Sequence, residues 1–163
     1  MIISSLLKSQ ATNFFIPENQ TTIIDSLNYL EIQDPNLALR LAFKVLDKYP
    51  IDTKDKTILK VYNVIGQIYL KKGLSVQALQ YFMEVDRESI RINNPSYWNL
   101  INIGNVYYQE KKWMKAEEYF IRAYEDVIKR IRHDGNEKRN VMAVSLMNRA
   151  MIFKDLKEYE KSY

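Results

Sequence analysis

The sequence predicts an all-α protein made of repeated helical hairpins, and three observations lead to this fold class. Gly66 and Tyr69 recur as Gly104 and Tyr107, about 38 residues further along, within the period of roughly 20–50 residues that marks repeat proteins. The 163 residues include only four Gly and four Pro, which is little material for the many turns of a β-rich fold. Apolar residues also recur every three or four positions, for example Leu59, Tyr62, Ile65 and Tyr69, as they do along one face of a helix.

Two helices are expected before Pro50. Thr22 and Asp25 have the spacing of a capping box, which would start the first helix. Asp34 followed by Pro35 places an N-cap carboxylate before a proline at the first helical position, where its missing N–H is harmless. Pro50 ends the second helix, because the residue before a proline avoids the helical region.

The remaining helices are predicted from similar local signals. Ser75 and Ser96 are expected to be N-caps, and Gly73 is expected to end a helix in the left-handed conformation. Asp134-Gly135-Asn136 is a clear turn. The expected helices cover about 54–72, 75–92, 96–110, 113–133 and 137–155, and a further helix begins at Lys157.

The repeated residues resemble the tetratricopeptide repeat, in which each helix of a hairpin carries a small residue near an aromatic one. Ala42 departs from the pattern, since it stands where the central copies have phenylalanine. Spacing longer than the usual 34 or so residues indicates an extended-helix type. The residues that match the repeat signature are Ser26, Tyr29, Ala38, Gly66, Tyr69, Ala78, Phe82, Gly104, Tyr107, Ala116, Phe120, Ala150 and Phe153.

The resemblance implies a right-handed superhelix, or solenoid, of about four antiparallel helical hairpins. The hairpins are expected at about 19–54, 55–95, 96–136 and 137–163, the last of them incomplete. Residues 1–18 are expected to form a separate N-terminal segment, either the tail of a clipped signal peptide or a short helix.

The same resemblance places the first helix of each hairpin on a concave face that would bind a peptide. Carboxamides suit this role, because each can donate to and accept from a peptide backbone; the alternative is that they are solvated surface residues. Leu70, Trp98 and Tyr108 would be apolar anchors or would pack between repeats, and packing is favoured for Trp98 and for Trp113. The groove residues are Asn63, Gln67, Lys71, Asn102, Asn105, Tyr108, Gln109, Asn148 and Met151.

Chemistry other than binding finds little support in the sequence. There is no Cys and a single histidine, His133, so a thiolate or His-rich metal site is not expected. No catalytic constellation and no phosphate-binding loop is recognisable. The net charge of +4 is spread along the chain, and the densest basic cluster, around Lys129 and Arg130, suits a helix C-terminus better than nucleic acid. Some tetratricopeptide proteins hold the C-terminal carboxylate of a ligand with a set of Lys, Asn and Arg side chains. Only Asn102 falls at one of the corresponding positions here, so such a site is not expected.

The sequence thus predicts a protein- or peptide-binding scaffold, not an enzyme, with no cofactor and no metal, as part of a larger and signalling protein. The alternative is a regulatory receptor domain that changes its curvature on binding a small signalling peptide. We expect no membrane span and no nucleic-acid partner, and a homodimer could form through the uncapped C-terminal end. A cytoplasmic location is favoured, or a secreted or periplasmic one if residues 1–11 are a clipped signal peptide.

Overall fold

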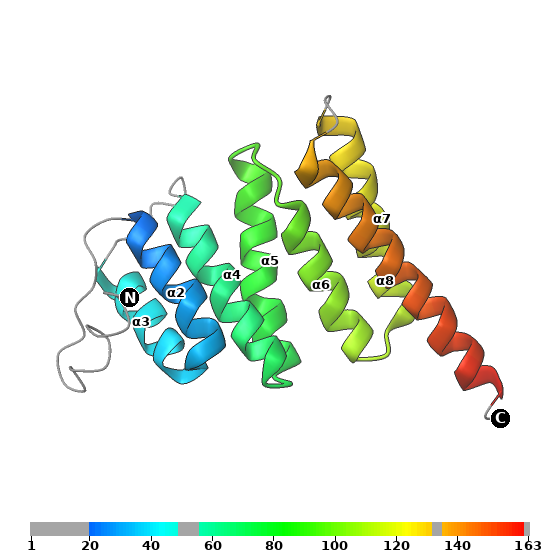
Figure 1. Cartoon of the computed structure of the whole chain (residues 1–163), viewed down its shortest axis with the longest axis horizontal. Helices are drawn as coiled ribbons and strands as arrows, with labels where there is room; N and C mark the ends of the chain where they lie inside the picture. The colour runs from blue at the N-terminus through cyan, green and yellow to red at the C-terminus, as the bar shows by residue number, and fades with distance from the viewer. Residues whose placement is uncertain (1–19, 49–55, 132–134, 162–163) are drawn as a thin grey trace. The chain divides into compact units, whose positions relative to one another are not determined.

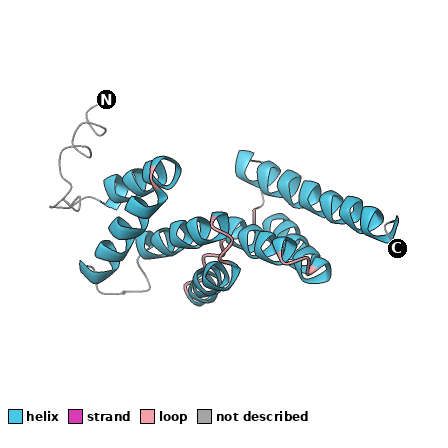
Figure 2. Ribbon diagram, turned by 90° about the horizontal axis from the view of Figure 1, so that it is seen from below, coloured by secondary structure: helices cyan, strands magenta, loops and turns pink. Residues whose placement is uncertain are grey.

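The computed structural model of this chain describes residues 20–48, 56–131 and 135–161, and all of its regular structure is helical. Within these residues there is no strand, and short loops join the helices (Figures 1 and 2). The prediction of an all-α protein is therefore confirmed, while the superhelix stays a prediction. The helices are α2 (Gln20–Gln33), α3 (Pro35–Lys48), α4 (Lys56–Lys71), α5 (Ser75–Arg91), α6 (Tyr97–Gln109), α7 (Trp113–Arg130) and α8 (Asn136–Lys161).

The chain divides into two compact units, Met1–Ile65 and Gly66–Tyr163. In the first unit α2 packs on α3. Asp34 caps α3 as predicted, because its Oδ1 accepts a hydrogen bond of 2.9 Å from the backbone N–H of Leu37. Thr22 does not start α2, which already includes Gln20. The apolar core of this hairpin includes Ile23, Leu27, Leu30, Ala38, Leu41, Ala42 and Val45.

In the second unit the last turns of α4 precede α5, and α6 contacts α5, α7 and α8. Ser96 caps α6, with its Oγ 3.3 Å from the backbone nitrogen of Asn99. Gly73 ends the turn after α4 with φ +72°, as predicted. Ser75 does not cap α5: it is the first helical residue, and Leu74 before it supplies no side-chain hydrogen bond.

The repeated glycines make room for phenylalanine rings. A Cβ at Gly66 would lie within 3.0 Å of three ring carbons of Phe82, and a Cβ at Gly104 would lie equally close to Phe120. Both rings are fully buried. The two copies therefore build the same close approach between the two helices of a hairpin, which an added methyl group would obstruct.

A pair of tyrosine stacks repeats with the glycines. The rings of Tyr69 and Tyr81 stack at 5.8 Å between centroids, and those of Tyr107 and Tyr119 stack at 5.5 Å. Tyr69 and Tyr107 belong to the predicted repeat signature, whereas their partners Tyr81 and Tyr119 do not. Offset stacking of this kind adds to the stabilisation from burial.

The end of the second unit differs from the expectation of a fourth hairpin. Instead of a helix to Asp155 and a new one from Lys157, α8 runs unbroken from Asn136 to Lys161. Among the signature residues, Ala150 and Phe153 on this helix are exposed, and so is Tyr29 in the first unit. The other signature residues are buried or half-buried.

Candidate functional site

Predicted groove residues meet where α6 lies beside α8. The side-chain amide of Asn148 on α8 donates a hydrogen bond of 3.1 Å to the amide oxygen of Asn105 on α6. Both side chains are half-buried. This contact uses one of the two amide N–H groups of Asn148 and one lone pair of the amide oxygen of Asn105. Each side chain can therefore form further hydrogen bonds.

A second contact joins the same two helices. The hydroxyl of Tyr108 on α6 donates a hydrogen bond to the carboxylate of Asp155 on α8. This hydrogen bond, followed by burial, raises the pKa of Tyr108 to about 12. Tyr108 also meets the ring of Trp113 edge-on, at 5.3 Å between centroids. We call the four residues Asn105, Tyr108, Asn148 and Asp155 the α6–α8 polar seam.

Contacts with α5 and α7, together with buried residues of α8, hold α6 and α8 in place. The side chain of Asn99 is fully buried and donates a hydrogen bond of 2.8 Å to the backbone carbonyl of Phe82, which fixes α6 against α5. On α8, Val141, Ser145 and Ile152 are buried at helical spacing. Arg149 binds Glu117 on α7 at 3.0 Å. The seam thus lies on helices whose packing is already determined.

The other predicted groove residues lie around the seam or on α4. Asn102 is half-buried one turn before Asn105, whereas Gln109 and Met151 are exposed. On α4, Asn63 and Gln67 are half-buried and Lys71 is exposed; Asn63 falls in the first compact unit. The seam therefore unites three of the predicted residues, and this is where we place the candidate site. Asp155, its fourth member, was missed.

Two of the three predicted apolar anchors, Leu70 and Tyr108, pack against core clusters, and the third, Trp98, is more exposed. Leu70 packs against the cluster around Phe82, and Trp113 packs with Tyr108 against the cluster around Phe120. Trp98 instead leaves 41% of its surface exposed, and its packing between repeats stays a prediction.

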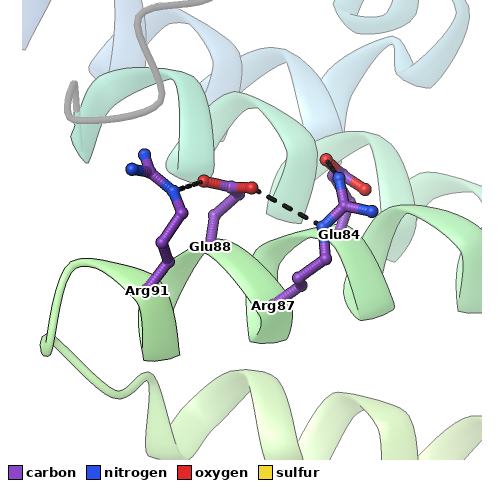
Figure 3. Close-up of polar contacts among 4 residues, drawn as sticks. All are labelled: Glu84, Arg87, Glu88 and Arg91. Atoms are coloured by element: carbon purple, nitrogen blue, oxygen red, sulfur yellow. Dashed lines mark hydrogen bonds and ion pairs between the residues drawn. The ribbon is translucent and has the colours of Figure 1, made fainter.

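Charged groups on α5 form a separate cluster that is paired within itself (Figure 3). The Glu88 side chain is only 8% exposed, and its carboxylate lies 2.6 Å from Nε of Arg91 and 3.5 Å from Nε of Arg87. The hydrogen bond from Arg91 is the main cause that lowers the pKa of Glu88. Arg87 also pairs with Glu84. Each carboxylate in this cluster has an arginine beside it, so the cluster offers structural support to α5 and little spare charge for a ligand.

The cations near the end of α7 are likewise engaged locally. Lys129 pairs with Glu125 at 3.0 Å, one turn earlier. Arg130 donates a hydrogen bond of 3.3 Å to Asn93, and Lys138 donates one of 3.1 Å to the carbonyl of Ile131. His133 lies outside the described residues.

Two negative findings apply to the described residues. No three His, Cys, Asp or Glu side chains there gather in a group that could hold a metal ion. In the same part of the chain, no helix combines the length and apolar character needed to cross a bilayer.

Comparison with known proteins gives no match: no family model fits the chain, and no curated protein or solved structure is detectably similar to it. The resemblance to tetratricopeptide repeats therefore rests on the residues of this chain.

Proposed function

We propose that this protein is a tetratricopeptide-like scaffold that binds a protein or peptide ligand across the α6–α8 polar seam. The observation that supports this role most directly is the contact between Asn105 and Asn148. It joins two carboxamides from helices that are far apart in the sequence. An extended peptide presents alternating N–H and C=O groups, and paired carboxamides match both.

The seam is also organised before a ligand arrives. Tyr108 is held by Asp155 on one side and by the edge of Trp113 on the other. A side chain that is already restrained loses less conformational freedom on binding, so more of the interaction appears as affinity. Tyr108 would be the apolar contact of the site, and the two asparagines would be its polar contacts.

Selection from a random peptide library displayed on phage tests this proposal, followed by fluorescence polarisation of the best binder. We expect Asn105→Ala and Asn148→Ala to weaken binding about 2- to 12-fold each, which corresponds to one lost hydrogen bond of roughly 0.5–1.5 kcal/mol. Asn140→Ala is the matched control, since Asn140 is exposed on α8 and lies outside the seam. Unchanged affinity in both the Asn105 and the Asn148 variants would contradict the proposed site.

Two further sequence-based predictions have their own tests. A receptor that changes curvature should give different small-angle scattering profiles with and without the selected peptide, whereas a passive scaffold should not.

A homodimer would use the exposed apolar residues of α8, among them Leu146, Met147 and Phe153. Sedimentation at two protein concentrations, with Phe153→Ser as the comparison, distinguishes dimer from monomer. The place within a larger signalling protein stays a prediction.

A further inference from the structure

A hollow of about 360 Å³ opens between the start of α7 and the C-terminal half of α8. Its floor is apolar and consists of Trp113, Ile152 and Leu156. Ile152 is buried, and the other two are half-buried and pack against the core cluster around Phe120. The volume lies at the lower end of the roughly 300–1,000 Å³ range of ligand pockets. An apolar floor of this size fits a single large side chain.

The rim of the hollow carries three exposed cations, Lys111, Lys112 and Lys115. Met114, next to them, is 88% exposed. The first turn of α7 contains no acidic residue, so the positive end of the helix dipole adds to the lysine charges. The hollow therefore combines an apolar base with a positive edge.

Nearby carboxylates do not neutralise this edge. Glu117 also lines the hollow, but its carboxylate receives two hydrogen bonds from Arg149, at 3.0 and 3.2 Å. Glu110 lies 3.7 Å from Lys112, and both side chains are exposed, so water screens this pair strongly. The local balance at the hollow stays positive.

In the first copy of the repeat, the equivalent turn between α4 and α5 lacks the residues that form this hollow and its positive edge. There the places of Lys111, Lys112, Trp113 and Lys115 are taken by Gly73, Leu74, Ser75 and Gln77. The hairpin can thus close without three lysines and a tryptophan, and they are not a requirement of the fold.

Lys111 in addition occupies a conformation that costs energy. Its φ is +56°, close to the +72° of Gly73 in the first copy. A residue with a side chain in this left-handed region is disfavoured by about 1–2 kcal/mol, and glycine avoids that cost. The second copy therefore keeps a cation where glycine would be more stable, as is common where a residue serves binding.

We propose that this hollow binds an acidic peptide segment through one apolar anchor side chain. The anchor would lie on Trp113, Ile152 and Leu156, and carboxylates beside it would face the three lysines. The inference rests on the proposed peptide-binding function and names the chemistry of the ligand. Trp113 contacts Tyr108, so the hollow adjoins the seam, and one peptide can follow both.

Fluorescence polarisation with designed peptides tests this inference. The probe is a fluorescein-labelled acidic peptide with a central Phe between Glu residues; its two matched relatives replace the Phe with Ala or every Glu with Gln. We expect the probe to bind at least tenfold more tightly than either relative, because aromatic anchors and charge complementarity both contribute. Its affinity should fall as salt is added. Equal affinity for all three peptides, or none for the probe, would overturn the proposal.

A charge-matched pair of variants locates the binding. The rim variant combines Lys111→Gln, Lys112→Gln and Lys115→Gln, all on exposed side chains. The control combines Lys154→Gln, Lys157→Gln and Lys161→Gln, which are exposed on α8 and remove the same charge. We expect the rim variant to lose about tenfold in affinity for the probe and the control less than about twofold. Equal losses would show that net charge alone attracts the peptide, against the proposal.

Failure of this inference differs from failure of the proposed function. If peptides bind in an Asn105-dependent way while the rim variant is unaffected, the scaffold role stands and the hollow is not part of it. If the probe depends on the rim but not on Asn105, the hollow stands and the seam is not the site. Binding of the protein to anionic phospholipid vesicles, lost in the rim variant, without binding of the probe would assign the hollow to a membrane surface and overturn the peptide proposal.

Discussion

The α6–α7 hairpin and helix α8 carry the same repeat signature in opposite surroundings. On α6, Gly104 lies under the fully buried ring of Phe120 from α7. On α8, Ala150 holds the equivalent place but is exposed, and Phe153 leaves 55% of its surface exposed. The comparison teaches that matching residues do not by themselves determine burial, because Gly104 is buried under a ring from α7 whereas Ala150 is exposed. Burial, and with it stability, comes only where another helix packs on these residues.

The largest difference is expected between two phenylalanines. Phe120→Ala should lower the free energy of unfolding by about 3–5 kcal/mol, because it removes a fully buried ring and leaves a cavity. Phe153→Ala, on an exposed face, should change it by less than about 0.5 kcal/mol. Urea denaturation followed by circular dichroism measures both. Comparable losses of stability in the two variants would mean that the face of α8 that carries Phe153 is buried in solution.

The small residues give the next effect. Gly104→Ala should cost about 1–3 kcal/mol, because the new methyl group would be overpacked against Phe120. Alanine's better helix propensity, worth about 1 kcal/mol, would only partly offset this. Ala150→Gly should cost only that propensity difference. Thermal unfolding of both variants provides the measurement, and a stabilised Gly104→Ala protein would contradict the close packing.

The turns preceding α5 and α7 offer a third contrast. Lys111→Gly should raise the free energy of unfolding by about 1 kcal/mol, because it relieves the left-handed strain, and Gly73→Lys should lower it by a similar amount. The melting temperatures of the two variants should therefore move in opposite directions. A lower melting temperature for Lys111→Gly would show that the lysine side chain stabilises the turn more than its backbone is strained.

The contact between Tyr108 and Asp155, which joins α6 to α8, should have an effect no larger than these near neutral pH and a smaller one in alkali. Tyr108→Phe should cost about 1 kcal/mol through the lost hydrogen bond to Asp155. The pKa of Tyr108 is raised from 10.0 to about 12, so the folded protein holds the phenolic proton more tightly than the unfolded chain. This stabilisation is present below pH 10 and is lost as the pH rises towards 12.

Denaturation of wild type and Tyr108→Phe across this range checks the prediction, and the gap between them should narrow as Tyr108 ionises. A constant gap up to pH 12 would contradict the assigned pKa.

Much of the fold could be predicted because its signals are local. Asp34, Gly73 and Ser96 each act within one helical turn, and the structure confirms all three. The predicted break before Lys157 is wrong. Asp155, Leu156 and Lys157 include no glycine or proline to end a helix, so α8 continues through them.

The candidate site was less accessible to sequence reasoning. The resemblance to tetratricopeptide repeats predicts Asn105 and Asn148 on one concave face, but their hydrogen bond depends on how α6 and α8 pack. Asp155 is not among the predicted site residues, because the sequence pattern predicts a helix end there; in the structure α8 continues, and Asp155 lies two turns after Asn148 on the same face. The buried Asn99 gave no signal, because an asparagine inside a helix is ordinarily expected on the surface.

Phe82 makes two different contacts that affect how the second unit unfolds. Its ring covers Gly66 within one hairpin, and its backbone carbonyl accepts the hydrogen bond from the buried amide of Asn99 on the next helix. Releasing α5 would therefore open the packing on α4 and strand a buried polar group on α6. Neighbouring repeats joined in this way should exchange their protected amide hydrogens together, as one cooperative unit.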